Sequence, residues 1–202
     1  MLVGGLLLLA RAAAVAGLYE AHQIEIGAAL ELQGNGHFRY QFDYGAVSEH
    51  AEGDWSLDGG KVRLTTRPAP KPSSFELVRD EPAPAGEVVM ALEPPGFGDG
   101  YRLDAIATDA GSGEKGRVTT NEQGRVDSGG HLLSALDPLV PVYDVVGGHF
   151  PLSAARGHRL LLRFHANDLG TAAFDREPLV FTDGDLVLKR YDREIRFIRV
   201  RP

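Results

Sequence analysis

The chain has 202 residues, enough for one large domain or two small ones, and 43% of them are hydrophobic, which excludes global disorder. It carries 21 basic and 28 acidic residues, and the net charge of −7 gives no electrostatic reason to bind nucleic acid. The absence of cysteine excludes disulfides, thiolate metal sites and a cysteine nucleophile. The 25 glycines and 12 prolines indicate a fold with many turns.

The first residues read as an export signal. An apolar run at 2–10 is followed by Arg11 and by the small-x-small sequence Ala14-Val15-Ala16. This pattern predicts a secretory signal at residues 1–16, cleaved after Ala16, and a periplasmic or secreted location. An N-terminal core helix is the alternative. The run is too short to span a membrane, and no other approaches that length, so we expect no stable membrane span in the mature form.

Two segments that follow predict a half-buried hairpin. Residues 24–32 and 37–44 alternate apolar and polar side chains, which is the period of a strand. The loop Gly34-Asn35-Gly36 is typical of a three-residue hairpin turn. It sets a register in which Leu32 faces Phe38 and Ile26 faces Tyr44. One face of the second strand is then aromatic, formed by Phe38, Tyr40, Phe42 and Tyr44.

A second hairpin is predicted from residues 52–57 and 61–66, with Gly59-Gly60 as its turn. Its register places Trp55, the only tryptophan, opposite Leu64. We expect Trp55 to bury into the same core or cavity as the aromatic face, provided that the connection after Tyr44 shifts the parity of the strand by one. Three prolines at 68, 70 and 72 then mark a stiff connection.

The rest of the chain also reads as strands. Candidates in an irregular middle part lie at 75–78, 87–92, 101–108, 117–120 and 140–146. Strong alternation returns at 158–165, 179–181, 186–188 and 195–200, with Asp183-Gly184 as a hairpin turn. Residues 170–175 have room for one helical turn.

These elements predict an all-β fold class. Each end of the chain supplies about four strands, too few to close a barrel, whereas eight suffice. We therefore expect an antiparallel meander or barrel formed by the N- and C-terminal strands, with an intervening β-sandwich-like lobe. The expected divisions are a signal at 1–16, a meander at 17–72, the lobe at 73–147, and a C-terminal meander at 148–202 that completes the barrel.

Short stretches resemble known families. Leu30-Glu31-Leu32, Asn35-Gly36-His37-Phe38, Tyr44-Gly45 and Gly53-Asp54-Trp55 are similar to the opening hairpins of lipocalin-like barrels. Residues 117–126 are similar to a strand–turn–strand of transthyretin-like and Cna-B-like sandwiches. The whole chain resembles uncharacterised exported β proteins of Gram-negative bacteria. The resemblance implies a fold class and names no ligand or catalytic residue.

The candidate ligand-binding residues form two groups. The aromatic face with Trp55 either lines a ligand cavity or fills the barrel, and filling is the default for a small barrel. The second group, His165, Asn167 and Asp168, ends a strong strand and either lines a pocket mouth or makes an ordinary turn. No catalytic residue is assigned.

The sequence gives little support for a metal site, a serine nucleophile or a nucleotide cofactor. The seven histidines show no metal-ligand spacing, and the densest local set, 49–52, reads as a polar loop, so no metal is expected. Ser128-Gly129-Gly130-His131 lacks the elbow of a nucleophilic serine and reads as a turn. No phosphate-binding glycine loop occurs, and no cofactor is expected.

Three functions are compatible with these observations. The favoured one is a non-enzymatic exported protein that binds a small apolar or amphipathic ligand, or a partner such as an envelope protein. The second is a hydrolase or isomerase without a sequence signature that uses His165 and Asp168. The third is a structural module of the envelope. A pocket lined by aromatic side chains favours the first, and a cleft with converging titratable groups favours the second.

Export predicts a processed N-terminus. Protein purified from its native host is expected to begin at Gly17, because signal peptidases cleave after a small-x-small sequence such as Ala14-Val15-Ala16. N-terminal sequencing checks this, and a chain that still begins with Met1 contradicts export.

Overall fold

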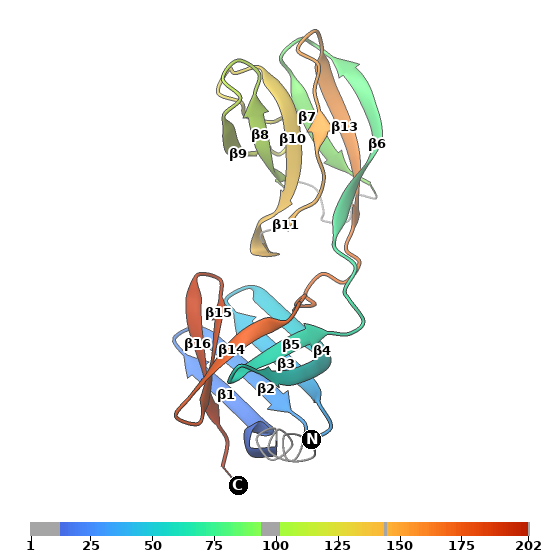
Figure 1. Ribbon diagram of the computed structural model, residues 1–202. Coiled ribbons are helices and arrows are strands. Elements are labelled where there is room, and N and C mark those ends of the chain that lie inside the picture. The colour runs from blue at the N-terminus through green and yellow to red at the C-terminus, as the bar shows by residue number, and fades with distance from the viewer. Residues whose placement is uncertain (1–12, 94–101, 144, 202) are drawn as a thin grey trace. The chain divides into compact units, whose positions relative to one another are not determined.

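The computed structural model describes residues 13–93, 102–143 and 145–201, and nearly all of its regular structure is β-strand (Figure 1). The chain divides into two compact units. One combines the residues up to Pro70 with those from Gly170 onward, and the other spans Lys71–Leu169. We call them the barrel and the lobe.

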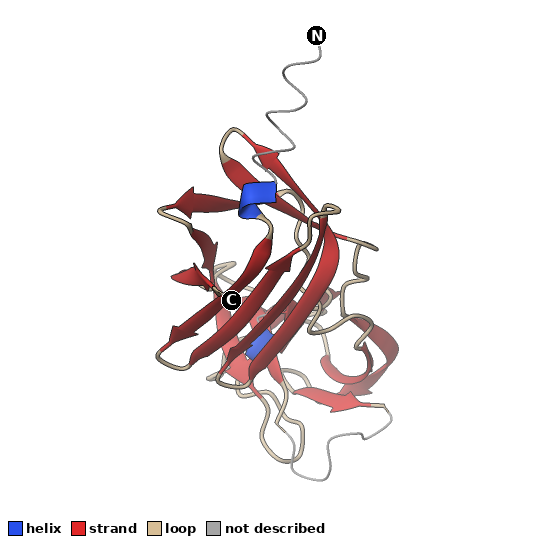
Figure 2. Ribbon diagram, turned by 90° about the horizontal axis from the view of Figure 1, so that it is seen from below, coloured by secondary structure: helices blue, strands red, loops and turns tan. Residues whose placement is uncertain are grey.

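The barrel is a closed sheet of eight strands in the order β1-β16-β15-β14-β5-β4-β3-β2 (Figures 1 and 2). The strands are β1 (Gly17–Gln23), β2 (Ile26–Leu32), β3 (His37–Tyr44), β4 (Val47–Asp58), β5 (Lys61–Thr66), β14 (Glu177–Thr182), β15 (Asp185–Arg190) and β16 (Arg193–Arg199). Early and late strands meet twice, at β5–β14 and at β1–β16. The predicted fold class, a barrel built from both ends of the chain around an intervening lobe, is confirmed.

The hairpin registers follow the turn residues. Leu32 pairs with Phe38 and Ile26 with Tyr44, as predicted from the three-residue loop. Trp55 pairs with Leu64 across the Gly59-Gly60 turn. Tyr44 pairs with Val47 across a two-residue turn, which gives the required parity shift and puts Phe38 opposite Gly53. The even-numbered aromatics of β3 and the odd-numbered Trp55 therefore share the inner face.

Some barrel elements differ from the prediction. Residues 17–23 form β1, and residues 24 and 25 are its turn into β2. β4 begins at Val47 rather than at the predicted residue 52. The pattern missed its start because Glu49, a charged residue at an inward position, interrupts the apolar alternation. Residues 170–175 form no helical turn: Thr171 bridges His50 of β4, and the segment runs alongside that strand.

Side chains fill the barrel. Tyr19, Phe38, Tyr40, Phe42 and Phe197 are at most 2% exposed. The Phe174 ring enters from the segment before β14 and meets the Tyr40 ring edge-on, with 5.0 Å between centroids. Trp55 is 7% exposed, and its indole N–H donates to the Gln33 carbonyl at 2.8 Å. The aromatic face thus packs as a core, the default for a barrel of this size.

One end of the barrel, where β1 begins and β16 ends, holds the chain that precedes β1. The Val15 side chain belongs to the barrel core at 5% exposure. The Tyr19 hydroxyl donates to the Val15 carbonyl, and Arg199 donates to the carbonyls of Ala14 and Ala16, all at 2.6 Å. Of the predicted signal at 1–16, residues 1–12 lie outside the described residues.

The lobe contains two sheets. One has the order β11-β10-β8-β9 with β12 also on β10, and the other the order β6-β13-β7. The strands are β6 (Ser74–Ala83), β7 (Val88–Leu92), β8 (Asp104–Asp109), β9 (Lys115–Thr119), β10 (Leu133–Val140), β11 (Val145–Val146), β12 (Phe150–Pro151) and β13 (Gly157–His165), with a 3-10 turn at Pro141–Tyr143. The two sheets share a core in which Met90, Leu136 and Leu162 are nearly inaccessible.

Two predicted strands need correction here. The strand at 158–165, expected to complete the barrel, is β13 and pairs with β6 and β7 in the lobe. The alternation of apolar and polar residues shows that a strand has one buried face, but it does not show to which sheet the strand belongs. Residues 133–140 form β10, which the prediction missed, and most of the strand expected at 140–146 is a 3-10 turn followed by β11. Positions 101 and 144 of the predicted strands lie outside the described residues.

None of the helices in the described part of the chain is long and apolar enough to cross a membrane.

The burial of Trp55 predicts a large effect of its removal. We expect Trp55→Ala to lower the free energy of unfolding by about 3–5 kcal/mol, because it leaves a cavity and removes the indole hydrogen bond to the Gln33 carbonyl. Urea denaturation followed by far-UV circular dichroism measures this without the lost fluorophore. Ile198→Ala is the control, because Ile198 is 59% exposed. A loss for Trp55→Ala no greater than that of the control contradicts the assignment of Trp55 to the core.

Candidate ligand site at the barrel mouth

Three hairpin turns lie at the barrel end opposite Val15, which we call the mouth. They are the turns of residues 24–25 between β1 and β2, 45–46 between β3 and β4, and 191–192 between β15 and β16. The β1–β16 ladder pairs Tyr19 with Arg199 and Glu20 with Ile198. Nearer the mouth, the Gln23 side chain bonds β16 instead, donating to the Glu194 carbonyl and accepting from the Arg196 N–H, each at 3.2 Å.

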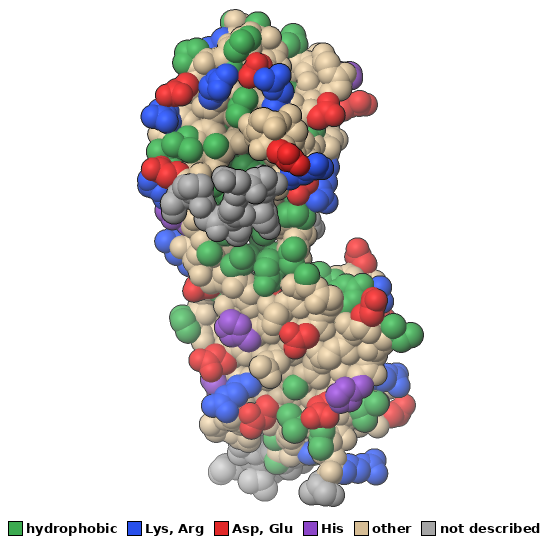
Figure 3. Space-filling view, turned by 180° about the vertical axis from the view of Figure 1, so that it is seen from behind, with side chains coloured by type: hydrophobic (Ala, Val, Ile, Leu, Met, Phe, Trp, Pro, Cys, Tyr) green, Lys and Arg blue, Asp and Glu red, His purple; other side chains and the backbone are tan. Residues whose placement is uncertain are grey.

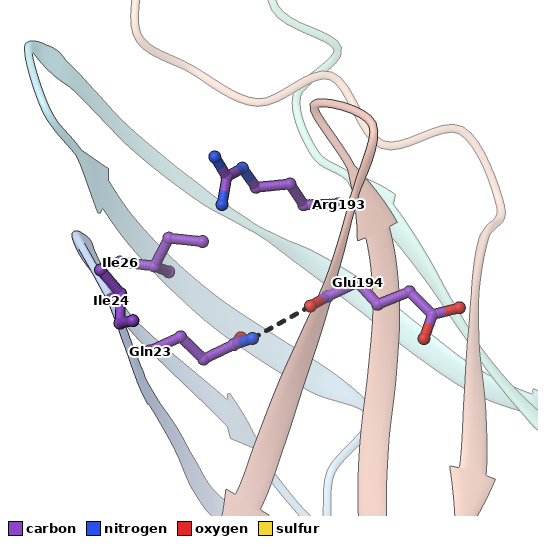
Figure 4. A pocket seen from close by; sticks show the side chains of 5 residues that line it. All are labelled: Gln23, Ile24, Ile26, Arg193 and Glu194. Atoms are coloured by element: carbon purple, nitrogen blue, oxygen red, sulfur yellow. Dashed lines mark hydrogen bonds between the residues drawn. The ribbon is translucent and has the colours of Figure 1, made fainter.

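An open hollow of about 450 Å³ occupies this seam (Figure 4), lined by Gln23, Ile24, Ile26, Arg193 and Glu194. The side chains of Ile26 and Arg193 face the hollow, whereas the Glu194 carboxylate is directed away from it. Ile24 is 88% exposed at the tip of its turn. The hollow therefore combines apolar surface with one guanidinium group.

The Arg193 guanidinium is held in place by Tyr44. It lies 5.0 Å from the centre of the Tyr44 ring, and its Nη2 donates to the Tyr44 hydroxyl at 2.9 Å. Within the described residues, no carboxylate lies within ion-pair distance of Arg193. A guanidinium has five N–H donors, so most of those of Arg193 remain for another acceptor.

Beneath the mouth, a group of three residues that we call the latch joins the β15–β16 turn to β4. Arg190 forms a bidentate pair with Glu49, with Nε–Oε2 at 2.8 Å and Nη2–Oε1 at 2.7 Å. The Tyr191 hydroxyl donates to the same carboxylate, and its ring stacks on Phe42 with centroids 5.5 Å apart. Burial raises the pKa of Tyr191 to about 12, and the bond to Glu49 adds to that.

The Tyr40 hydroxyl lies buried beside the latch. Tyr40 is 2% exposed, and its hydroxyl has no hydrogen-bond partner in the part of the chain that the structure describes. Burial raises its pKa, and the charge of Arg190 opposes the rise. The Phe174 ring lies between the two, with its centroid 5.0 Å from that of the Tyr40 ring and 5.4 Å from the Arg190 guanidinium carbon. A buried hydroxyl without a partner is unusual, because its desolvation is uncompensated.

The predicted site residues are distributed over both units. Phe38, Tyr40, Phe42 and Trp55 pack in the barrel core, and Tyr44 lies at the mouth. His165, Asn167 and Asp168 belong to the lobe, with partners of their own: His165 bonds Glu76, Asn167 donates to the Pro72 carbonyl, and Asp168 accepts from the Lys71 N–H. These last bonds tie together the two chain segments that enter and leave the lobe.

Apart from Tyr44, the sequence analysis did not identify the residues of the mouth. The set at 49–52 is strand, not a polar loop, and it directs Glu49 inward to Arg190. Arg190 and Arg193 flank a two-residue turn, but pairing within a hairpin does not show which charges turn inward. In the described residues no three metal-ligating side chains gather.

The lobe contains a buried polar cluster that resembles catalytic geometry. His158, 3% exposed, has its Nδ1 2.9 Å from Asp80, and its Nε2 accepts from the Ser153 backbone N–H at 2.9 Å. This assigns the proton to Nδ1, which donates to Asp80. The Ser153 hydroxyl instead accepts from the Ala155 N–H. The cluster therefore holds the loop before β13 and contains no activated nucleophile.

The sequence Ser128-Gly129-Gly130-His131 is a turn, as the sequence suggested. His131 bonds Asp109 at 3.0 Å, and Asp109 also accepts from the backbone and hydroxyl of Ser112. The backbone bond from Ser112 contributes most to lowering the pKa of Asp109 to about 2.

Comparisons of the chain with family models, curated proteins and solved structures found no significant match.

Asp80 predicts a pH dependence of stability. Burial alone would raise its pKa, but the hydrogen bonds from Arg156 and His158 outweigh it and hold the pKa below its usual value. A lowered pKa stabilises the fold above the unfolded pKa near 3.9, and this stabilisation is lost as pH falls through the folded pKa. We expect Asp80→Asn to lower the melting temperature at pH 7, and the deficit to shrink below about pH 4.

Thermal melts from pH 3 to pH 7 measure this effect. Glu122→Gln serves as the control, because Glu122 is an exposed lobe carboxylate outside the ion pairs. A deficit for Asp80→Asn that stays constant over this range contradicts the assigned role of the charge.

Proposed function

We propose that the chain is a non-enzymatic binding protein that takes a small amphipathic anion at the barrel mouth. Arg193, which has no carboxylate partner among the described residues, faces an open hollow beside Ile26, and this observation carries the proposal. A guanidinium selects a carboxylate or a similar anion by charge and by paired donors. The exposed Ile24 and the wall at Ile26 provide apolar surface for the rest of the ligand.

The filled barrel supports a ligand at the mouth rather than inside. A ligand within the barrel would have to displace aromatic rings that contact one another, such as Tyr40 and Phe174. At the mouth the hollow already exists, and Arg193 is already oriented by Tyr44. Preorganised groups bind at a lower entropic cost than groups that must be ordered on binding.

The surface chemistry supports a small ligand over nucleic acid. On the faces seen in Figure 3, acidic and basic side chains are interspersed. A net charge of −7 repels polyanions at long range, whereas a single guanidinium in a hollow still attracts one carboxylate.

Enzymatic chemistry at His165 and Asp168 has little support, because each is bonded to another partner, Glu76 and Lys71 respectively. We also propose that the protein is periplasmic or secreted, because the apolar run at its N-terminus has the pattern of an export signal. Cleavage after Ala16 would remove the carbonyl partners of Arg199 and the buried Val15 side chain.

Binding of a simple amphipathic anion tests the function. Isothermal titration is expected to show binding of decanoate, and little or none of decanol or decyltrimethylammonium. Arg193→Met should weaken decanoate binding about tenfold or more, because a charged hydrogen-bonded contact contributes about 1.5–3 kcal/mol.

Arg196→Met is the matched control, since Arg196 lies on the same strand and is also exposed but pairs with Asp185. No binding of any of the three amphiphiles would contradict the proposal and leave the structural module as the better interpretation. Equal binding of all three would contradict the role of Arg193.

A further inference from the structure

The contacts of Glu49 have the form of a bound carboxylate ligand. Glu49 is 7% exposed and accepts two parallel bonds from Arg190 and one from Tyr191. Bidentate pairing with a guanidinium, completed by a phenol, is how proteins hold the carboxylate of a small molecule. Glu49 projects from the wall of the barrel, so the chain itself supplies this carboxylate.

A donor beside the latch has no acceptor. The Tyr40 hydroxyl is buried and lacks a partner in the described residues. The Phe174 ring contacts both neighbours of this site: its centroid lies 5.0 Å from that of the Tyr40 ring and 5.4 Å from the Arg190 guanidinium carbon. The barrel gains nothing from this hydroxyl that a phenylalanine would not give, because the Tyr40 ring already packs against Phe42 and Phe174. A ligand oxygen would give the hydroxyl the acceptor that it lacks.

The turn that carries the latch is strained. Tyr191 and Asp192 have φ of 52° and 55°, a left-handed conformation that costs a bulky residue about 1 kcal/mol or more. The bond of Tyr191 to Glu49 and its stacking on Phe42 hold it there. A second hollow of about 500 Å³, lined by Lys189–Glu194, lies against this turn and shares Arg193 with the first. The turn lies outside the β15–β16 ladder, which ends at the pair of Arg190 with Arg193.

We infer that Arg190 and the Tyr40 hydroxyl form the carboxylate subsite of the mouth, and that Glu49 occupies this subsite when no ligand is bound. This inference rests on the proposed function and specifies its ligand as an amphipathic carboxylate. Arg190 and Arg193 line the same hollow, so the carboxylate contacts Arg193 at the surface and displaces Glu49 from Arg190. It also accepts from the Tyr40 hydroxyl, so Glu49 acts as an internal competitor.

Two substitutions test the inference, again with decanoate in isothermal titration. Glu49→Gln keeps the shape of the side chain but removes the competing charge, and it is expected to tighten decanoate binding about tenfold. Glu52→Gln is the matched control, because Glu52 lies on the same strand with its side chain exposed, and it should leave the affinity unchanged. A gain in both variants would indicate a general effect of charge and overturn the inference.

Tyr40→Phe separates a ligand contact from a structural one. It removes no hydrogen bond within the described residues, so the melting temperature should stay the same or rise. Decanoate binding should nevertheless weaken about fivefold. Unchanged binding would show that the hydroxyl serves no ligand and would overturn the inference, even if Glu49→Gln failed to fold.

The outcomes separate this inference from the proposed function. If the parent binds decanoate through Arg193 but neither Glu49→Gln nor Tyr40→Phe changes the affinity, the inference fails and the proposed function stands. If neither the parent nor Glu49→Gln binds, both fail. Tighter binding to Glu49→Gln than to the parent, with Glu52→Gln unchanged, supports the internal competitor.

Discussion

The pairing of β5 with β14 is the contact on which the barrel depends. It joins Leu64 to Glu177 and Lys61 to Val180, residues separated by the whole lobe. The first five strands form a meander of local hairpins, and the last three form another, but neither has enough strands to close. The barrel can therefore close during folding only after the late strands have been added. Non-local pairing of this kind is slow relative to hairpin formation. The aromatic core is complete only then, because Phe174 comes from the segment before β14 and Phe197 from β16.

The packing of that core determines where binding is possible. A barrel of eight strands has an interior that side chains fill, and here Tyr19, Tyr40 and Phe42 fill it. β1 and β16 stop pairing before the mouth, and the side chain of Gln23 bridges them there. At this end the inner face carries the ion pair of Arg190 with Glu49. The latch and Arg193 are thus a consequence of how the barrel ends as much as of its sequence.

The features of the fold that could be predicted are those set by residues close together in the sequence. Asn35-Gly36, Gly59-Gly60 and Asp183-Gly184 fixed three registers, because turn length sets pairing and pairing sets the face of each side chain. Membership of a sheet is not local, and for that reason the strand at 158–165 was assigned to the barrel although it lies in the lobe. The mouth was unpredictable for a related reason: Glu49 and Arg190 are far apart in sequence, and an acid on an inner face looks like an interruption until its partner is known.

The connection between the two units has a consequence for how the molecule unfolds. Lys71 and Asp168 bond each other at the entry and exit of the lobe, through one backbone and one side-chain contact, and Asn167 reaches Pro72 beside them. The lobe is therefore an insertion whose first and last residues are joined by hydrogen bonds, and we call this pair, Lys71 and Asp168, the neck. When the lobe opens, the neck keeps the ends of β5 and β14 close to each other, and the entropy of the released chain acts only weakly on the barrel. The two units can then behave as separate cooperative units, and a protease that cuts an opened lobe would leave a barrel made of two chains held by β-ladders on both sides of the cut.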